Sequence, residues 1–440
     1  MKKTITFTMI LTICISVFSQ EEQTKTGWNF GALPAITYST DLGFQYGVVI
    51  NLFDYGDGTK YPSYDQKFYF EVSRFTKGSS TYRLMYETKT LIPGINITSD
   101  LAYLTDQAYD FYGFNGYEAV YNADWTDDEL DPSIYKTRMF YNIDRKLFRF
   151  KNDIKGKIAG ENFQWNAGFE LKNFKFGQVN IEKLNKGKDE NLLPDVEGLY
   201  EKYIDWGIIP ADEAEGGFIT TLKAGITYDS RDFEANAMKG IWFETGVEAS
   251  PSFLSDAGFA KFFAIYRQYF TIIPKDLSFA YRLGYQTTIG GDVPWYHQNQ
   301  IITSVLAGTT SEGLGGSKNV RGVLRNRIVG DGLFYANAEF RWKTFRFYLI
   351  NQNFYIGFVG FSDFGMVTKK IEFEFPDAET MGEDQFANYF NPGSEKLHAS
   401  VGAGLRVVMN ENFIVSADLG KALNEKDGNI GFYIGLNYLF

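Results

Sequence analysis

The last ten residues of the chain, 431–440, alternate between large apolar side chains and side chains that are mostly small or polar. Successive side chains of a β-strand point to opposite faces, so a period of two predicts a strand with one face against an apolar environment. The chain is therefore expected to end on a β-strand that touches something apolar on one side. Counted back from the end, the apolar positions are Phe440, Tyr438, Leu436, Ile434 and Phe432.

Similar strand-like segments follow one another along most of the chain. A strand needs only about 9–11 residues to cross a membrane when it is tilted. Sixteen such segments begin near Trp28, Leu42, Gln66, Thr81, Ile95, Lys136, Asn162, Ile219, Gly240, Phe259, Leu277, Leu333, Phe354, Leu397, Asn412 and Ile430.

The clearest of these segments separate an apolar face from a polar one. In a transmembrane barrel the apolar faces would meet lipid and the polar faces would point into the lumen. A soluble β-sandwich, the alternative, would bury the apolar faces instead. The polar faces carry the residues that we expect in the lumen, Asp229, Glu339, Arg341, His398 and Arg406.

The lengths of the gaps between segments support the barrel. In an up-and-down barrel, gaps of one parity all emerge on the same side of the membrane, where the long extracellular loops lie. The four longest gaps follow segments five, seven, eleven and thirteen, all odd-numbered, and cover roughly 105–135, 178–218, 291–332 and 367–396. The sequence thus predicts an all-β fold, a 16-stranded antiparallel transmembrane β-barrel with long extracellular loops and a periplasmic N-terminus.

Composition agrees with this prediction. Aromatic residues make up 18% of the chain, glycines number 44, and the mean hydropathy is only −0.24. That combination is typical of a membrane barrel, in which only alternate residues meet lipid. The net charge of −11 argues against nucleic acid as a partner.

The start of the chain predicts export. Lys2 and Lys3 precede an apolar run from Ile5 to Phe18, as in a secretory signal peptide, which we expect to cover residues 1–19. Residues 20–27 would form a short periplasmic segment and residues 28–440 the barrel, which leaves no room between them for a folded periplasmic domain. Cys14 is the only cysteine, so the mature chain would hold no disulfide and no thiolate site.

The sequence offers little that suggests catalysis. It contains no Gly-x-Ser-x-Gly, no phosphate-binding Walker loop and no His-Glu-x-x-His. The two histidines, His297 and His398, are expected to play satisfied polar roles. We expect no enzyme, no catalytic or metal site and no cofactor.

One expected extracellular loop carries a distinctive motif. A glycine-rich stretch starting at Gly313 leads into Val320-Arg321-Gly322, which resembles the loop signature of the BamA/TamA outer-membrane barrels, the bacterial surface antigen family. Other segments match that family in order, and the clearest resemblance covers residues 219–440. They are Tyr228-Asp-Ser-Arg-Asp232 with Lys239-Gly240, Phe361-Ser-Asp-Phe-Gly365, Leu397–Arg406 and the terminal strand with Phe440.

The resemblance implies a role for single residues. In the family this loop folds back into the barrel, and its arginine contacts the aspartate of the Phe-x-Asp-x-Gly strand, so Arg321 would pair with Asp363. The terminal positions Phe432, Ile434, Leu436, Tyr438 and Phe440 would form the signal that is read when this barrel is itself inserted.

The resemblance also implies a function in the bacterial outer membrane. The expected role is in the assembly or insertion of outer-membrane proteins, as an accessory subunit working with a POTRA-bearing assembly barrel or with periplasmic proteins. The alternatives are a pore or transport channel and a structural surface barrel without insertase activity. Outer-membrane lipid and lipopolysaccharide are the expected surroundings.

Overall fold

The computed structural model describes residues 25–440 except 60–63, 303–311, 350–351, 410 and 412. The signal peptide expected at residues 1–19 lies outside the described residues and stays a prediction. None of the described helices is long and apolar enough to cross a membrane. The helices are short and lie between the strands: η1 (Gly116–Glu118), η2 (Ala123–Thr126), α2 (Ile181–Asn185), α3 (Leu199–Asp205), α4 (Trp295–Gln298), α5 (Ala378–Met381) and α6 (Glu383–Tyr389).

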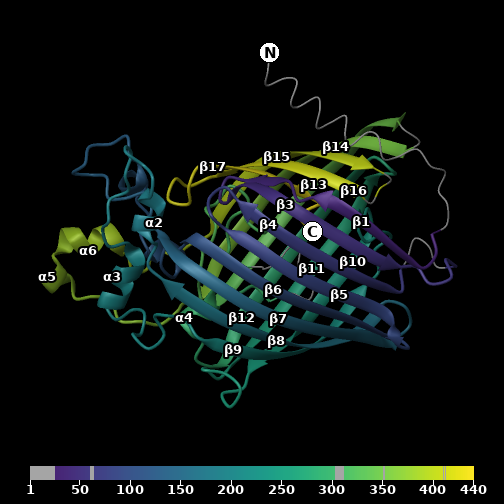
Figure 1. The fold of residues 1–440 in the computed structure, drawn as a ribbon, viewed down its shortest axis with the longest axis horizontal. Helices are drawn as coiled ribbons and strands as arrows, with labels where there is room; N and C mark the ends of the chain where they lie inside the picture. Colours follow the sequence, from purple (N-terminus) through teal and green to yellow (C-terminus); the bar gives the residue numbers. More distant parts are fainter. Residues whose placement is uncertain (1–24, 60–63, 303–311, 350–351, 410, 412) are drawn as a thin grey trace.

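Strands dominate the structure and curve around a common axis (Figure 1). They are β1 (Trp28–Pro34), β2 (Thr37–Ser39), β3 (Gly43–Asp54), β4 (Gln66–Phe75), β5 (Ser80–Ile92), β6 (Ile95–Asp110), β7 (Asn142–Ala159), β8 (Phe163–Gly177), β9 (Phe218–Asp229), β10 (Gly240–Ser250), β11 (Phe259–Ile273), β12 (Leu277–Gly291), β13 (Gly332–Leu349), β14 (Gln352–Lys369), β15 (His398–Met409), β16 (Phe413–Ala422) and β17 (Ile430–Leu436).

These strands close into a barrel of sixteen. From β3 to β17 each described strand pairs antiparallel with the next one along the chain. Both β1 and β2 pair with β3, so together they form the first barrel strand. β17 pairs with β2 and closes the sheet. The predicted 16-stranded antiparallel barrel is confirmed.

The two faces of the strands divide as the alternation predicts. On β13, Phe340 and Trp342 are each 55% exposed on the outer face, whereas Glu339 and Arg341 are fully buried on the inner face. An outer band of exposed apolar side chains suits lipid, and an inner polar face suits a lumen.

The long connections gather at one end of the barrel, where Figure 1 shows α2, α3, α5 and α6. They cover residues 111–141, 178–217, 292–331 and 370–397, which confirms the predicted pattern of long extracellular loops. Strand starts lie within two residues of the prediction, with one exception. The segment expected near Lys136 begins only at Asn142, because Phe140 and Tyr141 pack into the core of the loops instead of pairing in the sheet.

An aromatic core joins these loops above the barrel. Trp125 of η2 contacts Phe140 edge-on and packs at a tilt against Tyr389 of α6. Tyr203 of α3 packs against Phe111 and Phe390. Such aromatic pairs add about 0.5–1.5 kcal/mol each beyond the area they bury. The loops therefore form one packed body over the outer end of the barrel.

The terminal strand is shorter than the alternation predicts. Phe432, Ile434 and Leu436 lie exposed on the outer face, but β17 ends at Leu436. Asn437 adopts a left-handed conformation with φ of 70°. The chain turns inward there, so the prediction that the strand continues to Phe440 is wrong for the last four residues.

Candidate functional site

The loop between β12 and β13 folds back into the lumen and builds a small core of its own. Val320 is fully buried with Leu314, Val323 and Ile328 of the same loop. The cluster also contains Leu333 of β13 and Val367 of β14, so it fixes the loop to the barrel wall. Burial of this kind gives the loop a defined path and places the next residue, Arg321.

Arg321 is fully buried and held by Asp363 of β14. Its Nε donates to Asp363 Oδ2 at 2.8 Å and its Nη2 to Oδ1 at 3.0 Å, a bidentate arrangement. The backbone N–H of Arg321 donates to the same carboxylate at 3.1 Å. Three bonds from one residue to one carboxylate set both the position and the direction of the loop.

The rest of the Phe-x-Asp-x-Gly segment receives the loop as well. The ring of Phe361 lies under the Arg321 guanidinium, 3.5 Å from its central carbon. A Cβ on Gly365 would lie 3.2 Å from Val320, so the glycine leaves room for that side chain. The alternate positions Phe361, Asp363 and Gly365 thus each contact the Val320-Arg321 dipeptide.

Around this pair lies a buried network with balanced charge. Arg321 Nη1 lies 2.9 Å from Glu339 Oε1 and 3.5 Å from Asp418 Oδ2. Glu339 also pairs with Arg341 at 2.8 Å. Asp418, on β16, also pairs with Arg406 of β15 at 2.7 Å. Burial alone would lower the pKa of Arg321, but the neighbouring carboxylates of Asp363 and Glu339 raise it, so the guanidinium stays charged.

The next residue brings the loop against the last strands. Gly322 has φ of 93°, and a Cβ there would lie 2.6 Å from the carbonyl carbon of Gly420 on β16. Its backbone N–H donates to the Tyr433 hydroxyl on β17 at 3.2 Å. Nearby, a Cβ on Gly316 would lie 3.1 Å from Asp41, in the turn after β2. The loop therefore touches β17 and the turn that follows β2, one on each side of the closure.

The closure itself is short. Among the described residues, the ladder between β17 and β2 has two residue pairs, Tyr433 with Ser39 and Ile434 with Tyr38. Just beyond it, the backbone N–H of Thr40 donates to the Phe432 carbonyl oxygen at 3.0 Å, and the Phe432 N–H donates to the Thr40 hydroxyl at 2.8 Å. The neighbouring ladder from β16 to β17 contains seven pairs. Beyond β2, the segment Trp28–Pro34 pairs with β3 alone among the described strands. We call this closure the seam, defined by residues 28–40 and 430–436.

The end of the chain enters the lumen beside the seam. A main-chain oxygen of Phe440 accepts a hydrogen bond from Arg341 Nη2 at 2.8 Å. The Arg341 guanidinium lies 4.3 Å from the ring centre of Tyr438 and 4.8 Å from that of Phe440. Because Arg341 also pairs with Glu339, the chain end joins the network that holds Arg321.

The other residues predicted for the lumen lie elsewhere along it. His398 stands at the outer end of β15, fully buried, between Asp427 (2.7 Å) and Glu395 (3.2 Å). Asp229 lies half-buried at the opposite end of the barrel and pairs with Arg231 at 2.7 Å. Only Glu339, Arg341 and Arg406 of the predicted set gather around Arg321. Neither Asp418 nor Tyr433 was predicted from the sequence, although Asp418 falls on the inner face of β16 by simple alternation.

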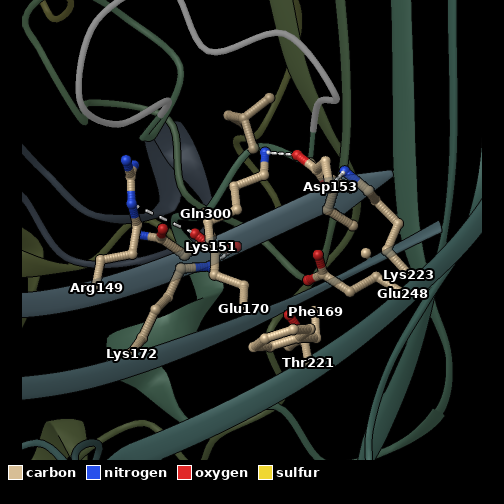
Figure 2. A pocket seen from close by; sticks show the side chains of 13 residues that line it. Arg149, Lys151, Asp153, Phe169, Glu170, Lys172, Thr221, Lys223, Glu248 and Gln300 are labelled. Atoms are coloured by element: carbon tan, nitrogen blue, oxygen red, sulfur yellow. Dashed lines mark ion pairs between the residues drawn. The ribbon is translucent and has the colours of Figure 1, made fainter. Parts of the chain in front are cut away.

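The wall across the barrel from the seam is cross-linked by charge. Figure 2 shows Lys151 of β7 and Lys223 of β9 reaching Asp153, at 3.0 and 2.9 Å. On β8, Glu170 lies 2.8 Å from Lys172 and 3.7 Å from Arg149 of β7. These pairs join β7, β8 and β9 side to side. The wall is thus held by long ladders and ion pairs together, whereas the seam is held by a ladder of two residue pairs and the hydrogen bonds between Thr40 and Phe432.

A family model then decides the identity: residues 105–440 match the Omp85 superfamily domain. The chain belongs to the Omp85 superfamily. This Omp85 barrel is a protein of the bacterial outer membrane with no enzymatic activity, and lipid surrounds it. A search of curated proteins found no match.

Solved structures share the fold of this Omp85 barrel at low sequence identity. One is BamA from Haemophilus ducreyi lacking POTRA domains 1–3, with a TM-score of 0.56 and 15% identity over 94% of this chain and 71% of that one. Another is CdiB from Escherichia coli, with a TM-score of 0.57 and 10% identity over 96% of this chain and 64% of that one. This chain thus spans less than two thirds of the CdiB chain.

Proposed function

We propose that this Omp85 barrel takes part in the assembly or insertion of outer-membrane proteins and that the seam is its working part. The observation that carries the proposal is the two-residue ladder between β17 and β2. An incoming strand would pair with the edge that this short ladder leaves open.

The physics of a sheet edge in lipid supports this role. The second edge of β1 has no strand partner among the described residues. Unpaired N–H and C=O groups cost several kcal/mol each in the hydrocarbon region, so such an edge favours an added strand. Main-chain hydrogen bonds supply affinity in strand addition without demanding one sequence, which suits a client range of many barrels.

The loop supports the proposal because it touches β17 in the seam and the turn that directly follows the other side of the seam. Tyr433 accepts the Gly322 N–H on one side, and Gly316 packs beside Asp41 on the other. A loop fixed by Arg321 to β13, β14 and β16 can hold those two sides in register while the rest of the seam opens. Partners that deliver clients, such as a POTRA-bearing barrel or periplasmic proteins, belong to the same proposal.

A pore or transport channel is the alternative. The ion-paired lumen wall of β7–β9 favours it, since polar walls suit passage of polar cargo. The buried loop around Arg321 opposes a wide, permanently open pore.

A disulfide across the seam tests the two functions. Tyr38 and Ile434 lie directly opposite on the lipid face, so Tyr38→Cys with Ile434→Cys would lock the seam under oxidation. Val48→Cys with Val72→Cys is the matched control, because that lipid-facing pair joins β3 to β4 by a long ladder.

The readout is the amount of heat-modifiable, folded outer-membrane protein in cells that depend on each variant. We expect the seam lock to lower it and a reductant to restore it, with the control lock unchanged. Normal levels with the seam locked would refute the assembly role. A stable ohmic conductance that survives the lock, measured in planar bilayers, would favour the channel.

A further inference from the structure

Two lysines face each other on the lipid side of the barrel near its outer end. Lys146 of β7 and Lys175 of β8 are directly paired across the ladder. Both are exposed, and their neighbours Leu147 and Phe174 point the other way and are buried. Like charges placed opposite each other on one face of a sheet destabilise it unless something neutralises them.

Few groups of the protein neutralise this pair. Lys146 Nζ lies 3.7 Å from Asp144 Oδ1, and about half of the Lys146 side chain is exposed. Lys175 has no ion-pair partner among the described residues. Lys183 of α2 also acts electrostatically on Asp144, so Lys146 and Lys183 share this one carboxylate. In a chain of net charge −11 this is a local excess of positive charge.

The depth of the two lysines matches the headgroup region. Tyr103 of β6 pairs with Phe148 of β7, and both rings are exposed on the lipid face, as in the aromatic girdle of a barrel. Lys146 lies two residues further out along β7, about 7 Å along the strand. A lysine at that depth can lay its alkyl chain on lipid while its ammonium group reaches the phosphate layer.

We propose that Lys146 and Lys175, supported by Lys183, bind the phosphorylated headgroup of lipopolysaccharide in the outer leaflet. Two ammonium groups on one face can straddle a phosphate of the glycolipid headgroup, while Tyr103 and Phe148 below them contact its acyl chains. The site lies on the outer surface of β7 and β8, far along the sheet from the seam. It therefore goes beyond the proposed function, and it would orient the barrel against the outer leaflet.

The test is an equilibrium titration of the purified folded barrel in detergent with fluorescent bisphosphorylated lipid A, followed by anisotropy. We expect Lys146→Gln with Lys175→Gln to weaken binding about 30-fold, since each basic side chain at an anionic surface changes binding about fivefold. Dephosphorylated lipid A should bind the wild type as weakly as bisphosphorylated lipid A binds the double variant.

The matched control is Lys421→Gln. Lys421 is an exposed lysine at the outer end of β16, but it lies between Val401 and Ile430 and has no lysine opposite. The affinity of the Lys421→Gln variant for bisphosphorylated lipid A should stay within about twofold of that of the wild type. Heat-modifiable migration on gels shows which variants fold. Lys146→Gln alone, with an expected fivefold loss, keeps the test decisive if the double variant does not fold.

Two results would overturn the proposal. One is equal lipid A affinity for the wild type and the lysine variants. The other is competition by phosphatidylglycerol as effective as that by unlabelled lipid A, which would make the site a general one for anionic phospholipid. Neither measurement depends on assembly activity, so the two proposals can fail separately.

Discussion

Replacing Arg321 or Asp363 by alanine tests the energetics of the loop most directly. The side chains of the buried network comprise three arginines, Arg321, Arg341 and Arg406, and three carboxylates, Glu339, Asp363 and Asp418. Arg321→Ala leaves two cations with three anions, and Asp363→Ala leaves three cations with two anions. Either change strands a buried charge, at a cost of about 3–5 kcal/mol.

The double variant should behave differently from the sum of its parts. With both residues replaced, two cations face two anions and the balance returns. We therefore expect the double variant to lie within about 1 kcal/mol of the worse single variant, which corresponds to an interaction energy of about 3 kcal/mol. Asp363→Ala should cost at least as much as Arg321→Ala, because it also removes the acceptor of the buried Arg321 N–H.

The assay is urea unfolding of the barrel in detergent micelles, followed by tryptophan fluorescence, for the four proteins of the cycle. Arg346→Ala is the control, since Arg346 and Asp276 form an ion pair with nearly half of each side chain exposed. Its loss should cost no more than about 1 kcal/mol. Strictly additive losses for Arg321 and Asp363 would refute the coupling inferred from the geometry.

Two further predictions concern the contacts of the loop with the seam. Gly322→Ala adds a Cβ 2.6 Å from Gly420 at a φ of 93°, so it should displace the loop and speed its cleavage by added protease. Gly393→Ala is the control: its φ of 78° carries a similar backbone strain, but it lies in another loop with open space around it, so it should leave that cleavage unchanged. Burial, with the nearby Asp110 charge, raises the pKa of Asp41 to about 6, against the pull of Arg325 and Lys77. The folded state therefore binds a proton that the unfolded state releases between pH 3.8 and about 6, and stability falls as pH rises through that window. The difference in unfolding free energy between the wild type and Asp41→Asn should change across that pH range and become constant above it. If the unfolding free energies of both proteins vary with pH in parallel, the raised pKa is not that of Asp41.

Strand order and loop parity could be predicted because a barrel repeats one simple constraint. Each crossing needs the same alternation, and an error in one early strand would have shifted every later loop to the wrong side. The exception near Lys136 has a physical cause. Phe140 and Tyr141 look like strand residues by composition, yet they bury themselves among aromatic side chains of three loops, and no local pattern distinguishes the two environments.

The contacts of the functional site could likewise be predicted from the sequence only in part. The resemblance of Val320-Arg321-Gly322 to a known loop suggested Asp363 as the partner of Arg321, and the structure places them together. Alternation along β16 would also have placed Asp418 in the lumen. The inward turn at Asn437 was not predictable, because Tyr438 and Phe440 keep the period of two while their rings pack on Arg341 instead of lipid.

The inward course of the last four residues has a practical consequence. Any residue added after Phe440 would begin inside the barrel, next to Arg341 and the network that holds Arg321. A purification or epitope tag at that end would compete for the lumen with the loop itself. Segment 187–190 on the outer surface is exposed, so a tag inserted there would leave the interior undisturbed.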